Sequence, residues 1–138
     1  MMAKDLFHDL VKKALENDGW TITDDPLMVK VGDTQLYVDL GLEKLVSAER
    51  NGEKIAVEIK SFLNPSAMAD FHLALGQYVN YRFALEKSEE NRKLYLAVPD
   101  IAYEKFFKKE FIKMVIEQHN LNLIVYSTDE EEILKWIG

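Results

Sequence analysis

Hydrophobic residues near the start of the chain recur every three or four positions, which is the spacing of one face of an α-helix. The pattern predicts a helix over about residues 4–17, and Gly19 shortly after it provides a helix stop. The residues that follow this spacing are Leu6, Phe7, Leu10, Val11, Ala14 and Leu15.

Short runs of β-branched, aromatic and aliphatic residues follow, separated by residues that favour turns. They cover residues 20–23, 27–31, 35–42, 43–50 and 53–62. Asn51 and Gly52 stand between the last two runs, and Asn-Gly in this position is the strongest short-range signal for a β-hairpin. Later in the chain, residues 92–99 predict a buried strand and residues 121–127 a further strand.

Capping signals predict where the next two helices begin. Asn64 as the cap and Pro65 as the first helical residue open a long helix that runs over residues 64–87. Asp100 is the predicted cap of a third helix over residues 100–118.

Thr128 and Glu131 form a capping box, which predicts a short last helix that ends at residues 136–138. The resulting element order is α-β-β-β-α-β-α-β-α. An antiparallel meander followed by alternating helices and strands predicts an α/β fold with a mixed central sheet and helices on both faces. A length of 138 residues fits a single domain over residues 1–138.

Composition narrows the functions that such a fold can have. The chain has no cysteine, which excludes disulfides, thiolate metal sites and a cysteine nucleophile. The first residues lack the apolar core of a signal peptide and no apolar run is long enough to span a membrane, so a cytoplasmic protein is expected. With a net charge of -7, any DNA contact must come from a local basic patch or a bound metal.

The run at residues 53–62 carries two charged residues on one face of an otherwise apolar strand. Because side chains alternate along a strand, Glu58 and Lys60 share a face. By the same alternation Asp39 lies on the polar face of the run at residues 35–42, and it approaches Glu58 if the two strands pair nearby. The opposite face of the 53–62 strand is formed by Ile55, Val57 and Ile59.

Two neighbouring carboxylates repel each other, and a divalent cation resolves the repulsion. Asp39 and Glu58 are therefore predicted ligands for Mg²⁺ or Mn²⁺, since Mg²⁺ prefers one or two carboxylates, several waters and a substrate phosphate. Lys60 beside such an ion is placed to position the attacking water or to neutralise charge on the phosphate. The alternative is a Glu58–Lys60 pair on a partly exposed strand, with Asp39 merely ending its own strand.

The long predicted helix offers further groups to the same site. Gln77 and Tyr81 lie four residues apart and share a helix face with Asp70. This polar face is turned either to the predicted cleft or to solvent. The opposite face is apolar and consists of Met68, Phe71, Leu75, Tyr78 and Val79.

The order of these parts resembles the PD-(D/E)xK nucleases, the restriction-endonuclease-like superfamily, whose core is α-β-β-β-α-β. There an acid ends or bends the second core strand and an acid-x-Lys motif sits on the third, which implies catalytic roles for Asp39, Glu58 and Lys60. Residues 77–81 match the glutamine-x-x-x-tyrosine element of the RecB-like branch, which contacts DNA or the site. Val38 stands where the motif name places proline.

Many members of that superfamily also use an acid on the first helix. In this chain His8, at the edge of the apolar stripe, is the better candidate to face the site and bind substrate. The acids of the helix that lie away from the stripe are Asp5, Asp9 and Glu16.

More closely, the chain is similar to the XisH family, the fdxN element excision controlling factors. The stretches that carry the likeness are residues 19–26, 38–41, 54–62 and 74–82. The resemblance implies a role in programmed DNA excision in filamentous cyanobacteria, alongside a partner protein called XisI.

Three interpretations stay open from the residues. The first is a Mg²⁺-dependent endodeoxyribonuclease that acts in DNA rearrangement. The second is a catalytically silent module of nuclease fold that binds an XisI-like partner; the acidic charge and small size favour it, and a homodimer or heteromer would restore surface for DNA. The third is a plain α/β protein with a buried ion pair. A basic stripe on the third predicted helix, which is either solvated or a phosphate contact, comprises Lys105, Lys108, Lys109 and Lys113.

Overall fold

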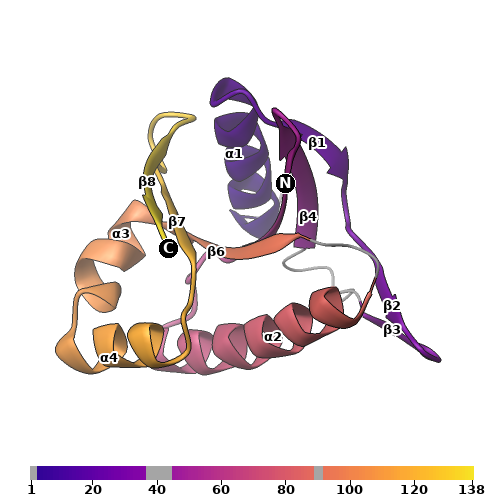
Figure 1. Ribbon diagram of the computed structural model, residues 1–138. Helices are drawn as coiled ribbons and strands as arrows, with labels where there is room; N and C mark the ends of the chain where they lie inside the picture. Colours follow the sequence, from indigo (N-terminus) through magenta and orange to yellow (C-terminus); the bar gives the residue numbers. More distant parts are fainter. Residues whose placement is uncertain (1–2, 37–44, 89–91) are drawn as a thin grey trace.

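The computed structural model describes residues 3–36, 45–88 and 92–138 (Figure 1). The helices are α1 (Ala3–Asn17), α2 (Ala67–Lys87), α3 (Asp100–Ala102) and α4 (Glu110–Gln118), with a π-helical turn η1 (Tyr103–Phe107). The strands are β1 (Thr21–Asp24), β2 (Val29–Val31), β3 (Thr34–Leu36), β4 (Leu45–Arg50), β5 (Glu53–Ile59), β6 (Lys93–Pro99), β7 (Leu123–Tyr126) and β8 (Ile133–Ile137).

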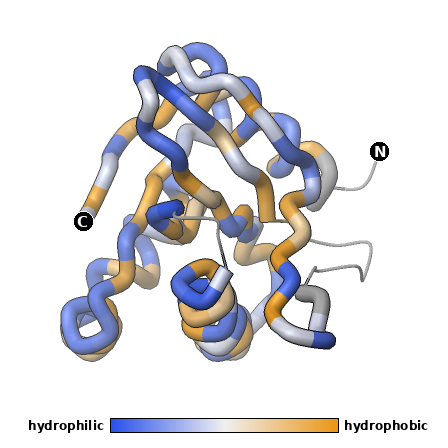
Figure 2. Tube along the Cα trace, turned by 45° about the vertical axis from the view of Figure 1, so that its right-hand side comes forward, coloured by the Kyte–Doolittle hydropathy of each residue, from blue (hydrophilic) through white to orange (hydrophobic). Residues whose placement is uncertain are grey.

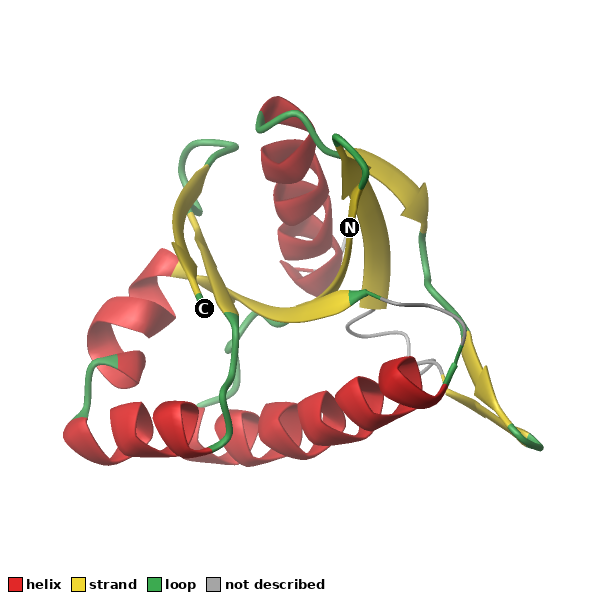
Figure 3. Cartoon of the chain, viewed as in Figure 1, coloured by secondary structure: helices red, strands yellow, loops and turns green. Residues whose placement is uncertain are grey.

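Six strands form one mixed sheet in the order β1-β4-β5-β6-β7-β8, and β2 pairs with β3 in a separate hairpin. β5–β6 and β6–β7 are parallel, and the other neighbours in the large sheet are antiparallel. Figure 3 shows the helices flanking this sheet. The predicted α/β fold with a mixed central sheet is therefore confirmed, and β5 lies inside it with a partner strand on each side.

The turn between β4 and β5 is the predicted Asn-Gly turn. Asn51 and Gly52 have φ angles of 52° and 82°, and a two-residue type I′ turn requires positive φ at both central positions. The antiparallel register extends to Leu45, which lies opposite Glu58. Because the turn determines the register, it also determines the face on which each β5 side chain lies.

Each face of the sheet has its own hydrophobic core. α1 covers one face, and α2, η1 and α4 cover the other, as the ribbon of Figure 1 shows. Hydrophobic and hydrophilic residues alternate within the helical turns in Figure 2, as expected for helices that bury one side. The core under α1 includes Val11, Leu15, Ile55, Val57 and Ile59. The core under α2 includes Ala56, Phe71, Tyr78, Leu96 and Phe107. The predicted alternation along β5 is thus confirmed, and it places Glu58 on the side of α2.

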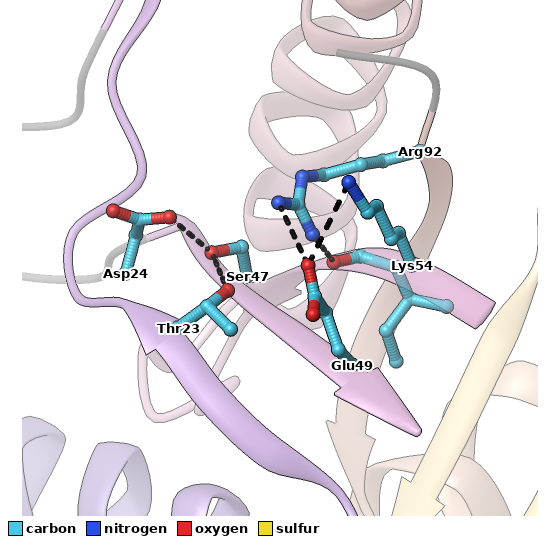
Figure 4. A network of polar contacts seen from close by, with 7 residues as sticks. Thr23, Asp24, Ser47, Glu49, Lys54 and Arg92 are labelled. Carbon is cyan, nitrogen blue, oxygen red and sulfur yellow. Dashed lines mark hydrogen bonds and ion pairs between the residues drawn. The ribbon is translucent and has the colours of Figure 1, made fainter. Parts of the chain in front are cut away.

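A buried polar network joins β1 to β4 where their pairing is irregular (Figure 4). Ser47 is fully buried, and its Oγ donates to Asp24 Oδ2 at 2.9 Å and lies 2.7 Å from Thr23 Oγ1. These bonds satisfy a hydroxyl that would be costly to bury alone, so they serve the fold. The figure also shows two ion pairs, which join Glu49 to Lys54 and to Arg92, each at 3.8 Å.

The predicted last helix is wrong, because residues 133–137 form strand β8 against β7. Trp136 packs on Trp20 and Tyr95, with ring centroids 5.8 and 5.1 Å apart. Thr128 Oγ1 donates to Asp100 Oδ1 instead of capping a helix. Pairing with β7 and burial of the indole outweigh a local capping signal, because tertiary contacts override helix propensity.

The prediction of one continuous third helix over residues 100–118 is wrong, because the structure divides this segment into α3, η1 and α4. Lys109 is extended, with ψ at 140°, and separates the π-helical turn from α4. The adjacent residues Phe106 and Phe107 of the π-helical turn are both buried, at 5% and 1% exposure. Their rings pack against Phe62 and Phe71, with centroids 5.2 to 6.4 Å apart.

The long helix ends at Lys87 as predicted but begins later, at Ala67. Ser66 is its cap, with Oγ accepting from Ala69 N at 3.1 Å. The predicted cap Asn64 instead donates from Nδ2 to Asp70 Oδ1 at 2.6 Å. Within the described ranges, no helix is long and apolar enough to cross a membrane.

Candidate active site

The backbone around Lys60 is held at the end of β5 by bonds to two other strands. Lys60 N donates to Ala97 O on β6 at 3.0 Å, and Tyr126 OH on β7 donates to Lys60 O at 2.9 Å. Glu58, two residues earlier, lies opposite Leu45 on β4 and Leu96 on β6. An interior strand with partners on both sides therefore fixes the direction of both charged side chains.

Glu58 and Lys60 are buried, with 1% and 5% of their surfaces exposed. The alternative of a pair on a partly exposed strand is wrong. Lys60 Nζ lies 3.8 Å from Glu58 Oε2, which is close enough for strong attraction in a poorly solvated site but too long for a hydrogen bond. Charged groups are expensive to bury unless they are paired or ligated.

Gln77 and Tyr81 reach this pair from α2. Lys60 Nζ donates a short hydrogen bond to Gln77 Oε1. Burial, and then the negative charge of Glu58, raise the pKa of Tyr81 to about 12, so its phenol is neutral at ordinary pH and lies within the field of Glu58. The structure thus brings together Glu58, Lys60, Gln77 and Tyr81.

The prediction of two opposite faces on the long helix is wrong in part. Tyr81 belongs to the same sheet-facing side as Phe71 and Tyr78, and all three are buried. Met68 and Val79, predicted on the apolar face, are instead exposed. Tyr78 OH donates to Leu94 O at 2.9 Å, so this tyrosine ties α2 to β6.

A small cleft opens beside Lys60 and is lined by Lys60, Phe62, Asp70 and Leu73. Phe62 has a φ of 53°, a left-handed conformation that is rare for a bulky residue. No signal in the sequence distinguishes this phenylalanine, because the conformation arises where the chain leaves the sheet. Asp70, which the helical pattern placed beside Gln77, does lie at the cleft.

The described oxygen donors fit a hard divalent cation in part. Glu58 offers a buried carboxylate, and Mg²⁺ requires only one or two carboxylates together with water and phosphate oxygens. Within residues 3–36, 45–88 and 92–138, no group of three or more His, Cys, Asp or Glu side chains is arranged to hold a metal. Asp39, the second predicted ligand, lies outside the described residues.

His8 lies on α1, which covers the opposite face of the sheet from α2. It is buried, and its Nε2 is 3.0 Å from Asp25 Oδ1, while Lys12 Nζ donates to Asp25 Oδ2 at 2.7 Å. Burial by itself raises the pKa of Asp25, but the hydrogen bonds from Lys12 and His8 outweigh it and lower that pKa below its usual value. The partner of His8 is therefore a carboxylate on the β1–β2 connection.

Comparisons with known proteins agree on one family. The family described as XisH protein matches residues 1–134. A crystal structure of an XisH family protein from Nostoc punctiforme PCC 73102 is 49% identical, with a TM-score of 0.89, and the match covers 97% of this chain and 100% of that one. A crystal structure of an fdxN element excision controlling factor protein from Anabaena variabilis is 50% identical, with a TM-score of 0.89 and coverage of 97% and 99%. Among curated proteins, none matches the chain.

Proposed function

Because the chain belongs to the XisH family, we propose that it is an excision controlling factor that acts as a metal-dependent DNA endonuclease of the PD-(D/E)xK type. The relative from Anabaena variabilis is described as an fdxN element excision controlling factor, which supports a role in DNA rearrangement. One observation carries the catalytic part of the proposal: Lys60 is buried beside Glu58 but donates its short bond to Gln77.

This arrangement supports catalysis better than a structural ion pair does. A buried pair that only stabilises the fold gains most from direct hydrogen bonds between its members. Here Nζ of Lys60 lies 3.8 Å from Glu58 Oε2 and is oriented by a residue of another element. An ammonium held beside a carboxylate in this way can also donate a hydrogen bond to a substrate group or to a water molecule.

Glu58, together with Asp39, would hold Mg²⁺ or Mn²⁺, which when bound supplies charge neutralisation at a phosphate and a more acidic water. Lys60 would donate a hydrogen bond to the scissile phosphate or to the attacking water. Gln77 would keep Nζ of Lys60 in place. Tyr81, neutral because its pKa is about 12, would act as a hydrogen-bond donor near Glu58.

The order of the elements also supports placing the fold with the restriction-endonuclease-like proteins. Helix α1 precedes the antiparallel strands β1, β4 and β5, after which α2 leads to the parallel strand β6. This is the α-β-β-β-α-β order of that superfamily, with the acid-x-Lys residues at the end of the third of these strands. The inserted hairpin of β2 and β3 lies outside the large sheet.

Calorimetric titration of Mg²⁺ and Mn²⁺ tests the proposal, followed by nicking of supercoiled plasmid DNA. We expect the wild type to bind metal and to nick DNA, and Glu58→Ala to lose both. Glu53→Ala provides the matched control, because Glu53 is an exposed acid on the same strand. Nicking that persists in Glu58→Ala, or a wild type without nicking in either metal, would contradict the proposal.

A second candidate is a silent nuclease-fold module that assembles with an XisI-like protein. It is favoured by exposed apolar side chains on α2 away from the cleft, where Val79 and Phe83 are 38% and 57% exposed. Exposed apolar surface of this kind marks protein interfaces. If it holds, Val79→Asp with Phe83→Asp abolishes co-purification with the partner, whereas Glu58→Ala leaves it unchanged.

A further inference from the structure

A groove of about 390 Å³ lies at the carboxyl ends of the parallel strands β5 and β6. The segment after β5 forms one wall and the start of α3 and η1 forms the other, with Phe7 of α1 and Thr128 at the end. The volume lies in the range of sites for small molecules or single residues of a polymer. In open α/β sheets, ligands bind outside the carboxyl ends of strands.

This groove adjoins the candidate active site. Phe62 lines both the groove and the small cleft that contains Lys60. Its left-handed backbone, with φ at 53°, directs the chain sharply away from β5 just after the catalytic motif. Sparsely populated backbone conformations of this kind cluster at functional sites. A ligand in the groove would therefore lie next to a group bound at Lys60.

The walls combine apolar and aromatic surface with one cation. Leu63 and Ile101 remain 47% and 56% exposed on either wall. Phe62, which is half-buried, supplies aromatic surface, the buried Phe106 lies behind it, and Lys105 also lines the groove. The described residues that line the groove include no acid, although the whole chain has a net charge of -7. Asp100 and Glu104 lie outside the groove, beside Ile101 and Lys105 in a neighbouring shallow cavity. The apolar walls suit a flat apolar group, and Lys105 offers one contact to an anion attached to it.

We propose that the groove receives one unpaired nucleobase of a DNA strand whose neighbouring phosphate lies at the cleft beside Lys60. The inference rests on the proposed phosphodiesterase function and adds a substrate class, a single-stranded or locally unpaired strand. Phe62 provides an aromatic face on which any base can stack without sequence preference, and the exposed side chains of Leu63 and Ile101 extend this apolar surface. Lys105 pairs with a phosphate of the same strand.

The test is fluorescence anisotropy of a fluorescein-labelled single-stranded dT12 oligonucleotide in EDTA, so that binding is measured without cleavage. Ile101→Asp should weaken binding about tenfold, which is at the lower end of the effect of losing the contacts of one bound base. Phe111→Asp is the matched control, because Phe111 is 62% exposed, does not line the groove and receives the same charge. It should change the affinity less than about twofold, and Ile101→Ala should give an intermediate loss without a charge change.

Two further measurements separate the contribution of the bound base from that of the phosphate contact. A series of oligonucleotides carries one abasic site each, at successive positions along the strand. When the abasic site falls at the base that occupies the groove, wild type and Ile101→Ala should bind with equal affinity. Lys105→Ala should reduce the slope of log affinity against log salt by about one contact, whereas Lys113→Ala, an exposed lysine of α4, should not.

Failure of this inference is distinct from failure of the proposed function. If the wild type nicks DNA but Ile101→Asp binds dT12 with the wild-type affinity, the groove binds no nucleobase and the inference is overturned. It is also overturned if Ile101→Asp loses binding to a protein partner while it still binds dT12 with the wild-type affinity. If no metal-dependent cleavage occurs but Ile101→Asp still loses the oligonucleotide, the nuclease proposal fails and the binding site stands.

Discussion

Lys60 and Gln77 are joined by a hydrogen bond that crosses from β5 to α2, with Nζ donating to Oε1. The two residues are seventeen positions apart, and the bond fixes the ammonium at the side of Glu58. Because the connection links the strand that carries the acid-x-Lys motif to the helix that covers it, it couples the position of the candidate catalytic lysine to the packing of α2.

Replacing Gln77 by leucine tests this coupling. Gln77→Leu removes one acceptor of a buried ammonium, so we expect the free energy of unfolding to fall by about 1–3 kcal/mol. Gln77→Glu retains an oxygen acceptor, so its free energy of unfolding should be close to that of the wild type. Urea unfolding at pH 7 provides the measurement, with Asn80→Leu on the exposed side of α2 as the control. A Gln77→Leu variant as stable as the control would show that the bond does not hold Lys60.

Glu58 should link folding to metal concentration. A ligand that binds only the folded state stabilises it in proportion to the logarithm of its concentration. The melting temperature of the wild type is therefore expected to rise as Mg²⁺ increases from micromolar to millimolar levels, and that of Glu58→Gln is expected to stay constant. Differential scanning calorimetry of both proteins, with Ca²⁺ as a second ion, checks this. Equal rises in the two proteins would remove Glu58 from the metal site.

Tyr81 predicts a loss of stability at alkaline pH. A tyrosine in an unfolded chain titrates near 10, whereas burial and then the charge of Glu58 raise the pKa of Tyr81 to about 12. The folded state therefore holds the proton more tightly, so its stabilising contribution is complete below about pH 10 and is lost as the pH rises towards 12. We expect the free energy of unfolding to decline over that interval, and to decline less in Tyr81→Phe.

Tyr78 also has a pKa raised by burial, so part of the decline persists in Tyr81→Phe. Urea midpoints at several pH values between 8 and 12 give the comparison. If Tyr81→Phe follows the wild-type curve, burial and the charge of Glu58 together do not raise the pKa of Tyr81.

Asp25 predicts the opposite dependence at acidic pH. Although burial opposes it, hydrogen bonds from Lys12 and His8 hold the pKa of Asp25 below its ordinary value of 3.8. Its stabilising contribution is present above pH 3.8 and is lost as the pH falls through the lowered pKa. The wild type should therefore lose stability below about pH 4 more steeply than Asp25→Asn. Asp129→Asn, at an exposed position, should follow the wild type.

Local sequence patterns determined the parts of this protein that depend on neighbouring residues. The Asn51–Gly52 turn, the alternation along β5 and the length of α1 follow from backbone preferences and periodicity alone. That Glu58 and Lys60 share a face was predicted for the same reason. Asp39 remains a prediction from sequence, because it lies outside the described residues.

Tertiary structure decided what depends on partners distant in the chain. Strand β8 exists because β7 offers an edge and Trp20 and Tyr95 offer a surface for Trp136, neither of which a capping pattern can show. The break at Lys109 and the packing of Phe106 and Phe107 against Phe62 and Phe71 likewise involve residues far apart in the chain. The same holds for the bond from Lys60 to Gln77, since only the packing of α2 on β5 brings that pair within reach.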